Sequence, residues 1–340
     1  MILSAQKIKA LEIASLPAFR PHPLLRNGHA QTLAGVYFPG ALPEYVAERH
    51  TLPLGDGDAT ILHDDCPADW QPGDAVALML HGLGGCHLSV YMRRTAEKLR
   101  ARGVRAFRMD LRGCGAAMEL ARLPYHSGRS ADAAAALAYL QTLCPGSPVT
   151  LIGYSLGGNI VLKLAGESGA NPPPNLLSVL TVCPPADLGV CSDWIGRKLN
   201  LVYDRYFARL LAAQLAERRA RNPEALHGEF PRLPTRLREI DDWFTAPTCG
   251  FGTADNYYRQ CASAPLLPEI RLPTLIIAAA DDPLVPAHSL KPLPLSPSTR
   301  LLITRHGGHL GYIGASGTDA DRRWIDWRVV DWVLAQHAAR

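Results

Sequence analysis

The chain has 340 residues, of which 47% are hydrophobic and 19% are charged. This balance is typical of a folded protein and excludes a chain that is disordered for lack of apolar residues. Lys and Arg outnumber Asp and Glu only by 35 to 31, so the charge gives no sign of a nucleic-acid groove, and we expect no nucleic-acid partner.

The beginning of the chain and its cysteines indicate a compartment. Lys7, Lys9 and Glu12 interrupt any apolar stretch that could serve as a signal peptide. No apolar run approaches the ~20 residues that a transmembrane helix needs. The eight cysteines are scattered without a C-x-x-C pair, as is typical of reduced thiols. We therefore expect a soluble, cytoplasmic protein without a transmembrane segment; peripheral membrane contact and the oligomeric state are left open.

From about residue 45 the chain alternates short apolar runs with segments of helical period. This alternation is typical of a mostly parallel sheet covered by helices. The first two runs flank a Gly-Asp-Gly turn and predict an antiparallel hairpin at one edge of the sheet. The expected strands are 45–52, 59–63, 75–80, 104–109, 149–154, 177–183, 274–279 and 300–304. The expected helices are 88–102, 130–143, 156–167 and 321–336.

Residues 187–265 interrupt this alternation for longer than a structureless loop allows, which predicts an inserted, mainly helical cap. Apolar and aromatic residues recur at helical spacing from Leu199 to Leu215, and we expect most of them to pack against the main domain. The predicted organisation has three parts. These are an N-terminal segment packed on the core (1–44), the α/β core (45–186 and 266–340) and the cap (187–265).

The strongest motif is a G-x-S-x-G at residues 153–157, placed between an expected strand and an expected helix. A serine nucleophile needs this placement, because the tight turn between the two elements holds its hydroxyl above the sheet. The glycines leave room for neighbouring backbone to approach. The alternative is a glycine-rich turn with an incidental serine. The position between strand and helix favours Ser155 as the candidate nucleophile.

A serine hydroxyl needs a base and an acid, which follow in the order Ser, Asp, His in this kind of fold. Asp281 and Asp282 follow one buried strand, and His306 and His309 follow the next. Carboxyl ends of parallel strands meet at one edge of a sheet, so these side chains are expected near the serine. We favour Asp282, which directly precedes Pro-Leu-Val, and His309, which closes the glycine-bearing loop. A metal site is disfavoured because no further ligand is suitably spaced.

Acyl transfer also needs two N–H groups directed at the oxyanion of the tetrahedral intermediate. We assign them to Leu156, which follows the nucleophile, and to Leu83 in the glycine-rich run 81–85. The alternative for this run is a turn that only reverses the chain, and His81 is expected to be structural. Neither glycine-rich run matches the dinucleotide pattern G-x-G-x-x-G or carries a P-loop lysine, so no cofactor is expected.

Together these motifs resemble those of the α/β-hydrolases, and more narrowly those of the YheT-like branch, bacterial relatives of the mammalian ABHD lipid hydrolases. The resemblance covers residues 18–335. Its further marks include Leu25-Arg26-Asn27-Gly28-His29-Ala30-Gln31-Thr32-Leu33, Asp110-Leu111-Arg112-Gly113-Cys114-Gly115, Tyr125-His126-Ser127-Gly128 and His306-Gly307-Gly308-His309-Leu310-Gly311.

The resemblance implies an α/β-hydrolase fold with a mostly parallel eight-stranded sheet and an inserted helical cap. It also implies a serine hydrolase of small carboxylic esters, such as short- to medium-chain acyl esters or acylglycerols, with Ser155, Asp282 and His309 as the triad. The alternative is an acyltransferase or thioesterase that uses the same residues, and less favoured is a binding module without catalysis. For Arg26, Asn27, His29 and Gln31, and for Tyr125 and His126, structural roles are expected.

Overall fold

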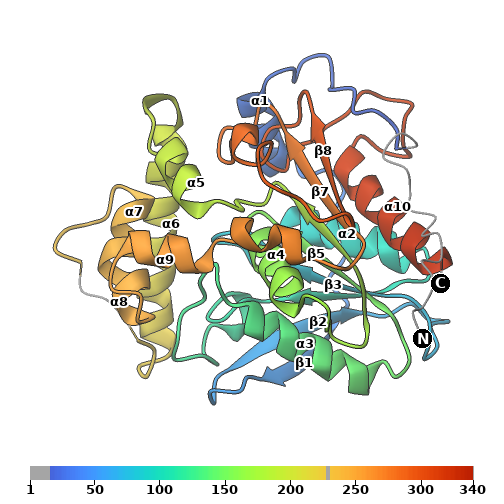
Figure 1. Cartoon of the computed structure of the whole chain (residues 1–340), viewed down its shortest axis with the longest axis horizontal. Helices are drawn as coiled ribbons and strands as arrows, with labels where there is room; N and C mark the ends of the chain where they lie inside the picture. The colour runs from blue at the N-terminus through green and yellow to red at the C-terminus, as the bar shows by residue number, and fades with distance from the viewer. Residues whose placement is uncertain (1–15, 227–229, 340) are drawn as a thin grey trace.

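The computed structural model describes residues 16–226 and 230–339, and within them the chain builds one eight-stranded sheet (Figure 1). The strand order is β1-β2-β4-β3-β5-β6-β7-β8. β1 and β2 form an antiparallel hairpin, β2 is antiparallel to β4, and the remaining neighbours are parallel. The strands are β1 (Glu48–Pro53), β2 (Ala59–Asp65), β3 (Val76–Leu80), β4 (Arg105–Met109), β5 (Val149–Tyr154), β6 (Leu176–Val182), β7 (Thr274–Ala279) and β8 (Thr299–Thr304).

The sequence prediction of the sheet is confirmed, because each expected strand is present and the hairpin lies at the edge. The central strands β3, β5 and β7 are buried along their whole length. Parallel strands that are covered on both faces carry continuous apolar runs, and this makes them visible in the sequence.

Helices cover both faces of the sheet. α2 (Val90–Arg100) and α10 (Trp324–Ala338) pack on one face around a core that includes Met92, Leu99 and Val329. α3 (Ser130–Leu143) and α4 (Leu156–Ser168) pack on the other face, around a second core. The sheet therefore lies between two hydrophobic layers, and its carboxyl ends are left open to the loops that carry the polar motifs.

Between β6 and β7 the chain forms helices that lie to the left of the sheet in Figure 1. They are α5 (Leu188–Ile195), α6 (Leu201–Arg221), α7 (Leu237–Ile240), α8 (Ala246–Thr248) and α9 (Ala254–Cys261). The expected packing of residues 199–215 is wrong in part: Tyr203 and Leu211 of α6 are buried, but Leu199, which precedes α6, is 84% exposed, and Val202 and Tyr206 are 67% and 53% exposed. We keep the name cap for residues 187–265, and the three-part division stays a prediction.

The N-terminal segment contains a helix, α1 (Gly28–Tyr37), that the sequence did not predict. It lies beside the loops that follow β7 and β8, at the top of Figure 1. Residues 16–44 also contact α2 and the loop before α10, because Arg94 donates to the Pro39 carbonyl and His22 N–H donates to the Ile313 carbonyl. The first fifteen residues of this predicted segment lie outside the described residues.

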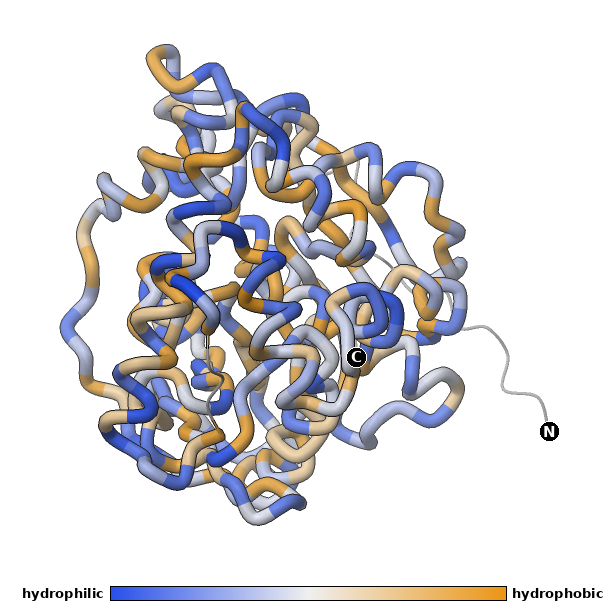
Figure 2. The backbone as a smooth tube through the Cα atoms, turned by 90° about the vertical axis from the view of Figure 1, so that its left-hand side faces the viewer, coloured by the Kyte–Doolittle hydropathy of each residue, from blue (hydrophilic) through white to orange (hydrophobic). Residues whose placement is uncertain are grey.

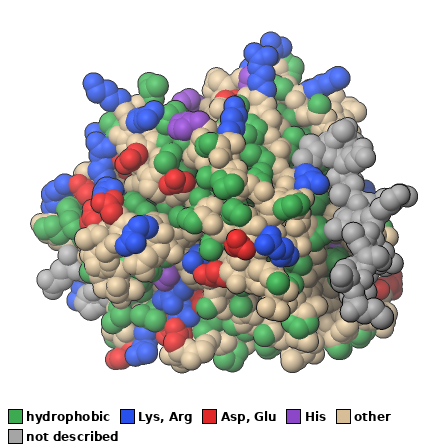
Figure 3. Space-filling model, viewed as in Figure 1, with side chains coloured by type: hydrophobic (Ala, Val, Ile, Leu, Met, Phe, Trp, Pro, Cys, Tyr) green, Lys and Arg blue, Asp and Glu red, His purple; other side chains and the backbone are tan. Residues whose placement is uncertain are grey.

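The distribution of charged and hydrophobic residues in the structure fits the mixed composition of the chain. Figure 3 shows cationic and anionic side chains interspersed over the face that it presents. Figure 2 shows hydrophobic and hydrophilic residues alternating along the backbone. Among the described helices none is both long enough and apolar enough to cross a membrane.

Candidate active site

Ser155 occupies a strained turn between β5 and α4. Its φ of +51° lies in the region that side chains other than glycine rarely adopt. A side chain would not fit at the neighbouring glycines. A Cβ on Gly157 would lie 2.5 Å from the His81 carbonyl oxygen, and a Cβ on Gly153 would lie 2.5 Å from the Gly157 carbonyl oxygen. The turn therefore holds the Ser155 hydroxyl at the end of β5, as the motif predicted.

The structure brings Ser155, His309 and Asp282 together. His309 Nε2 lies 2.9 Å from Ser155 Oγ, and its Nδ1 lies 2.8 Å from Asp282 Oδ2. A carboxylate only accepts hydrogen bonds, so Nδ1 carries the proton and Nε2 is free to accept the proton of the serine hydroxyl. The N–H groups of Leu284 and Val285 donate to Asp282 Oδ1, which fixes the orientation of the carboxylate.

The other two candidates, Asp281 and His306, lie beside each other. His306 Nδ1 is 3.3 Å from Asp281 Oδ2, and the Gly308 N–H donates to Asp281 Oδ1 at 2.9 Å. This pair ties the loop after β7 to the loop after β8. Its geometry is that of loop support, in agreement with the preference for Asp282 and His309.

The glycine-rich run 81–85 passes directly beside the serine. The Gly82 N–H donates to the Tyr91 hydroxyl, and the Gly84 N–H donates to the Tyr125 hydroxyl. Among the described residues the N–H of Leu83, between them, has no hydrogen-bond partner, and the same holds for the Leu156 N–H at the start of α4. Two unpaired donors next to a serine hydroxyl are the arrangement that an oxyanion hole requires.

Helix α1 supports the loop that carries the histidine. The His309 N–H donates to Thr32 Oγ1 at 2.8 Å, and Thr32 Oγ1 donates to the Gly28 carbonyl. Gly28 itself packs on the aspartate loop so closely that a Cβ would lie 1.7 Å from the Asp281 carbonyl oxygen. Thr32 lies within the run 25–33 that carries the family resemblance, but no role of its own was predicted for it from the sequence.

Other polar residues of the same run hold α1 in place. Asn27 caps the helix by accepting a hydrogen bond from the Ala30 N–H. The Gln31 amide donates to the Ile313 carbonyl and accepts from the Ile313 N–H, so it joins α1 to the segment after the histidine. His29 hydrogen-bonds to the cap through the Tyr203 hydroxyl, whereas Arg26 is exposed.

Replacing Thr32 by valine is expected to loosen the histidine loop. Valine has a similar shape but offers no acceptor to the part-buried His309 N–H, and a donor left without a partner inside the protein costs about 1–3 kcal/mol. We expect the free energy of unfolding, measured by urea titration, to fall by about that amount, together with a lower kcat. Thr32→Ser is the matched control because it keeps the hydroxyl. Equal stability of the Val variant, the Ser variant and the unmodified chain would contradict this role.

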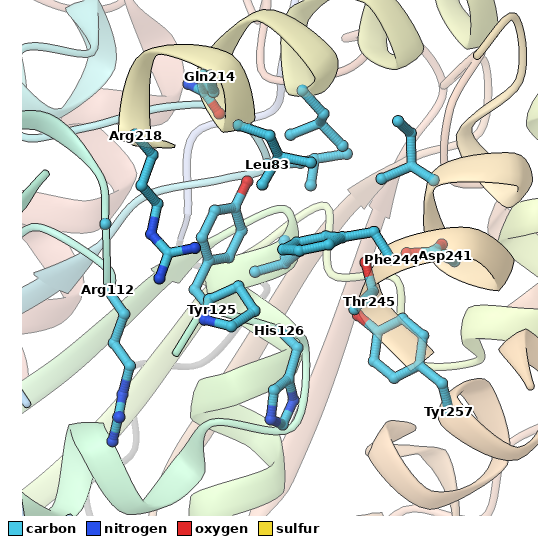
Figure 4. Close-up of a pocket in the computed structure, with 16 residues that line it drawn as sticks. Leu83, Arg112, Tyr125, His126, Gln214, Arg218, Asp241, Phe244, Thr245 and Tyr257 are labelled. Carbon is cyan, nitrogen blue, oxygen red and sulfur yellow. The ribbon is translucent and has the colours of Figure 1, made fainter. Parts of the chain in front are cut away.

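A cavity of about 110 Å³ opens between the serine and the cap. Its walls are mostly apolar, and besides Ser155 and His309 they include Leu83, Leu156, Leu188, Ile195, Phe207, Asp241, Tyr257, Tyr258, Leu284 and Val285. We call it the outer cavity. A second one of about 50 Å³, which we call the inner cavity, is also lined in part by the cap and shares Leu83, Leu156, Asp241 and Tyr257 with the outer cavity (Figure 4). A substrate bound at the serine can therefore extend on two sides.

The inner cavity carries several polar side chains. Burial, together with the nearby Arg129, Arg112 and Lys163, lowers the pKa of His126 to about 3, so this imidazole is neutral. Tyr125 supports Gly84 as described and also lines this cavity. Figure 4 shows Phe244 projecting into the middle of the cavity, between α6 and Tyr257.

A separate group of His63, His87 and Asp110 has the residue types of a metal site. Both imidazoles hydrogen-bond to the Asp110 carboxylate at 2.8–2.9 Å, and the N–H groups of His87 and Ala116 also donate to it. Ligands around a tetrahedral zinc at about 2.0–2.1 Å lie farther apart than hydrogen-bond partners do. The arrangement is that of a buried hydrogen-bond network that anchors the loop after β3.

The comparisons with known proteins concern the family and the fold. Residues 77–316 match the family described as "alpha/beta hydrolase fold". The Escherichia coli (strain K12) protein named "Putative esterase YheT" is 34% identical over 335 residues, covering 97% of each chain. The Danio rerio protein "Monoacylglycerol lipase ABHD2" is 27% identical over 92% of this chain and 77% of that protein. "Phospholipase ABHD3" of Mus musculus is 27% identical, and the match spans only 58% of its length.

Solved structures show the same fold at low sequence identity. Est1E from Butyrivibrio proteoclasticus superposes with a TM-score of 0.54 at 16% identity, over 85% of this chain and 99% of that one. The alpha/beta hydrolase GrgF from Penicillium sp. sh18 gives 0.58 at 15% identity, over 86% and 99%. At these identities the likeness concerns the fold alone.

Proposed function

This chain belongs to the alpha/beta hydrolase fold family, and we propose that it cleaves small carboxylic esters through a triad of Ser155, His309 and Asp282. The observation that carries the proposal is the hydrogen-bond chain from Ser155 Oγ through the imidazole to Asp282, with distances of 2.9 and 2.8 Å. The names of the relatives, an esterase and lipases, support the ester as the substrate class.

The first half of the reaction acylates the serine. Ser155 Oγ attacks the ester carbonyl carbon while His309 Nε2 takes the hydroxyl proton, and Asp282 stabilises the imidazolium that forms. The carbonyl oxygen gains negative charge and accepts hydrogen bonds from the N–H groups of Leu83 and Leu156. The C–O bond to the alcohol then breaks, and His309 returns the proton to the leaving oxygen.

The second half releases the acid. A water molecule gives its proton to His309 Nε2 and attacks the acyl carbon, through a second oxyanion held by the same two donors. Collapse of this intermediate breaks the bond to Ser155 Oγ, which recovers its proton from His309. Every proton and leaving group in this cycle is handled by residues of the site, so the hydrolysis needs no cofactor.

The experiment that tests this function measures acid release from p-nitrophenyl butyrate, with and without an added alcohol, and from butyryl thioesters. We expect the ester to be hydrolysed and water to remain the main acyl acceptor. Faster turnover of the thioester would indicate a thioesterase, and acyl transfer to the alcohol that outcompetes water would indicate an acyltransferase. No turnover of any ester would overturn the proposal.

A further inference from the structure

Asp241 lies where the outer and inner cavities meet. It lines both, and among the described residues it is the one carboxylate in the wall of the outer cavity. Figure 4 shows it on the same turn of the cap as Phe244 and Thr245, across the inner cavity from Gln214 and Arg218. A substrate held at the serine and extending into the inner cavity therefore passes this carboxylate.

The neighbouring acidic residues of the cap are paired with arginines. Glu239 pairs with Arg232, Asp242 pairs with Arg238, and Asp204 pairs with Arg236. Asp241 differs from them, because among the described residues no Lys, Arg or His nitrogen lies within ion-pair distance of its carboxylate. Arg218, which lines the inner cavity, donates instead to backbone carbonyls.

The environment of Asp241 is apolar but offers hydroxyl groups. Burial raises the pKa of its carboxyl to about 6, although hydrogen bonds from Tyr258 and Thr245 act in the opposite direction. Tyr258 Oη donates to Oδ2 at 2.7 Å. The group is therefore mostly ionised at neutral pH; hydroxyl donors contact it directly, whereas the positive charge of Arg238 acts on it only from beyond ion-pair distance.

The local backbone is also unusual. Asp241 begins a π-helical turn, Asp241–Thr245, that follows α7. Such turns are rare and occur frequently at functional sites, because the extra residue redirects a side chain. Here it places Asp241 at the junction of the cavities, while the next residue, Asp242, accepts a hydrogen bond from the Ala254 N–H.

An ionised group in an apolar cavity is costly unless further donors reach it. A carboxylate has about four acceptor positions, so Asp241 can accept more hydrogen bonds than its protein partners supply. A substrate hydroxyl is the same kind of donor as the hydroxyl groups that already contact Asp241. Moving a hydroxyl from water into the cavity also costs less than moving a cation. A substrate carboxylate would be repelled.

From this geometry we propose that Asp241 is a substrate-binding residue that accepts a hydrogen bond from a hydroxyl group of the ester, and that the site selects hydroxylated esters over plain alkyl and anionic ones. The inference rests on the proposed esterase function and specifies its substrate class. It concerns a residue of the cap that takes no part in the chemical steps.

The test compares kcat/KM for five esters of similar length. They are propyl hexanoate, 3-hydroxypropyl hexanoate, propyl 6-hydroxyhexanoate, hexanoylcholine and monopropyl adipate, with acid release followed by titration at constant pH. The two hydroxylated esters place the hydroxyl on either side of the scissile bond. Since a hydrogen bond to a charged group is the stronger kind, we expect one of them to exceed propyl hexanoate by about 10- to 100-fold. Monopropyl adipate should be the poorest substrate.

Asp241→Asn is expected to reduce that preference about tenfold, since the neutral amide is a weaker acceptor. The substitution should also raise kcat/KM for propyl hexanoate, because it removes a negative charge from the wall of an apolar cavity. Asp242→Asn is the matched control: it removes a carboxylate from the adjacent position and should keep the unmodified ratio. Circular dichroism and labelling of Ser155 by a fluorophosphonate check that each variant is folded.

The outcomes separate the two proposals. No hydrolysis of any ester contradicts the esterase function. Hydrolysis of propyl hexanoate without preference for either hydroxylated ester, or a preference that Asp241→Asn leaves intact, overturns the role of Asp241. A higher kcat/KM for hexanoylcholine than for the hydroxylated esters also overturns it, since the site would then select a cation. If Asp241→Asn does not fold, the order of the five esters in the unmodified protein still tests the selection, because the absence of a preference for a hydroxylated ester overturns the proposal.

Discussion

Replacing Ser155 by alanine is expected to lower kcat for p-nitrophenyl butyrate by about 10⁶-fold, leaving only the rate that the oxyanion donors and substrate binding provide. The variant lacks the oxygen that forms the acyl-enzyme bond, and none of the remaining groups replaces it. Initial rates under substrate saturation give the measurement. Because alanine is smaller and the turn is set by the surrounding glycines, the thermal unfolding midpoint should change little.

The matched control is Ser192→Ala, which removes another hydroxyl from the wall of the same cavity. Ser192 Oγ donates to Tyr258 at 3.1 Å and lies outside the hydrogen-bond chain of the triad. We expect its kcat to stay within about tenfold of the unmodified protein, as for a single neutral hydrogen bond. If Ser155→Ala kept a comparable rate in a preparation free of other esterases, Ser155 would not be the nucleophile.

Replacing Asp282 by asparagine is expected to lower kcat by about 10⁴-fold. The N–H groups of Leu284 and Val285 donate to Oδ1, so the amide oxygen of asparagine will occupy that position. Its NH₂ group then faces His309 Nδ1, where only an acceptor was present before. The imidazole is forced into the tautomer whose Nε2 carries the proton, and this tautomer cannot accept the proton of Ser155.

Asp281→Asn distinguishes the two adjacent aspartates. Its amide oxygen can still accept from the Gly308 N–H, so the loop keeps its main support and kcat should fall by less than about tenfold. Initial rates for both variants under identical conditions decide between them. A larger loss for Asp281→Asn than for Asp282→Asn would reverse the assignment of the acid.

The sheet and the main polar motifs could be predicted from the sequence because their signals are local. The buried strands β3, β5 and β7 are continuous apolar runs, and G-x-S-x-G lies directly at the end of one of them. The order of the elements then places the loops after β7 and β8 at the same edge as Ser155. Because these strands are parallel, loops that are far apart in the sequence come close together at the carboxyl edge of the sheet.

The remaining features depend on contacts between distant segments. Gly28 must be a glycine because a side chain would collide with the Asp281 carbonyl, and Thr32 accepts a hydrogen bond from the His309 N–H. Neither contact produces a periodic pattern in the sequence. The exposed Leu199 follows the same helical spacing as the buried Leu211, so periodicity alone could not separate them. Asp241 belongs to no motif, and its position depends on how the cap folds over the two cavities.

The most direct test of the triad is to map the site of covalent labelling. The unmodified protein is treated with a fluorophosphonate, digested, and analysed by mass spectrometry. A serine activated by His309 and Asp282 should carry one phosphonyl group per chain on the peptide that contains Ser155, and His309→Ala should label far more slowly. A phosphonyl group on another residue, or no labelling of a folded chain that hydrolyses esters, would contradict the mechanism.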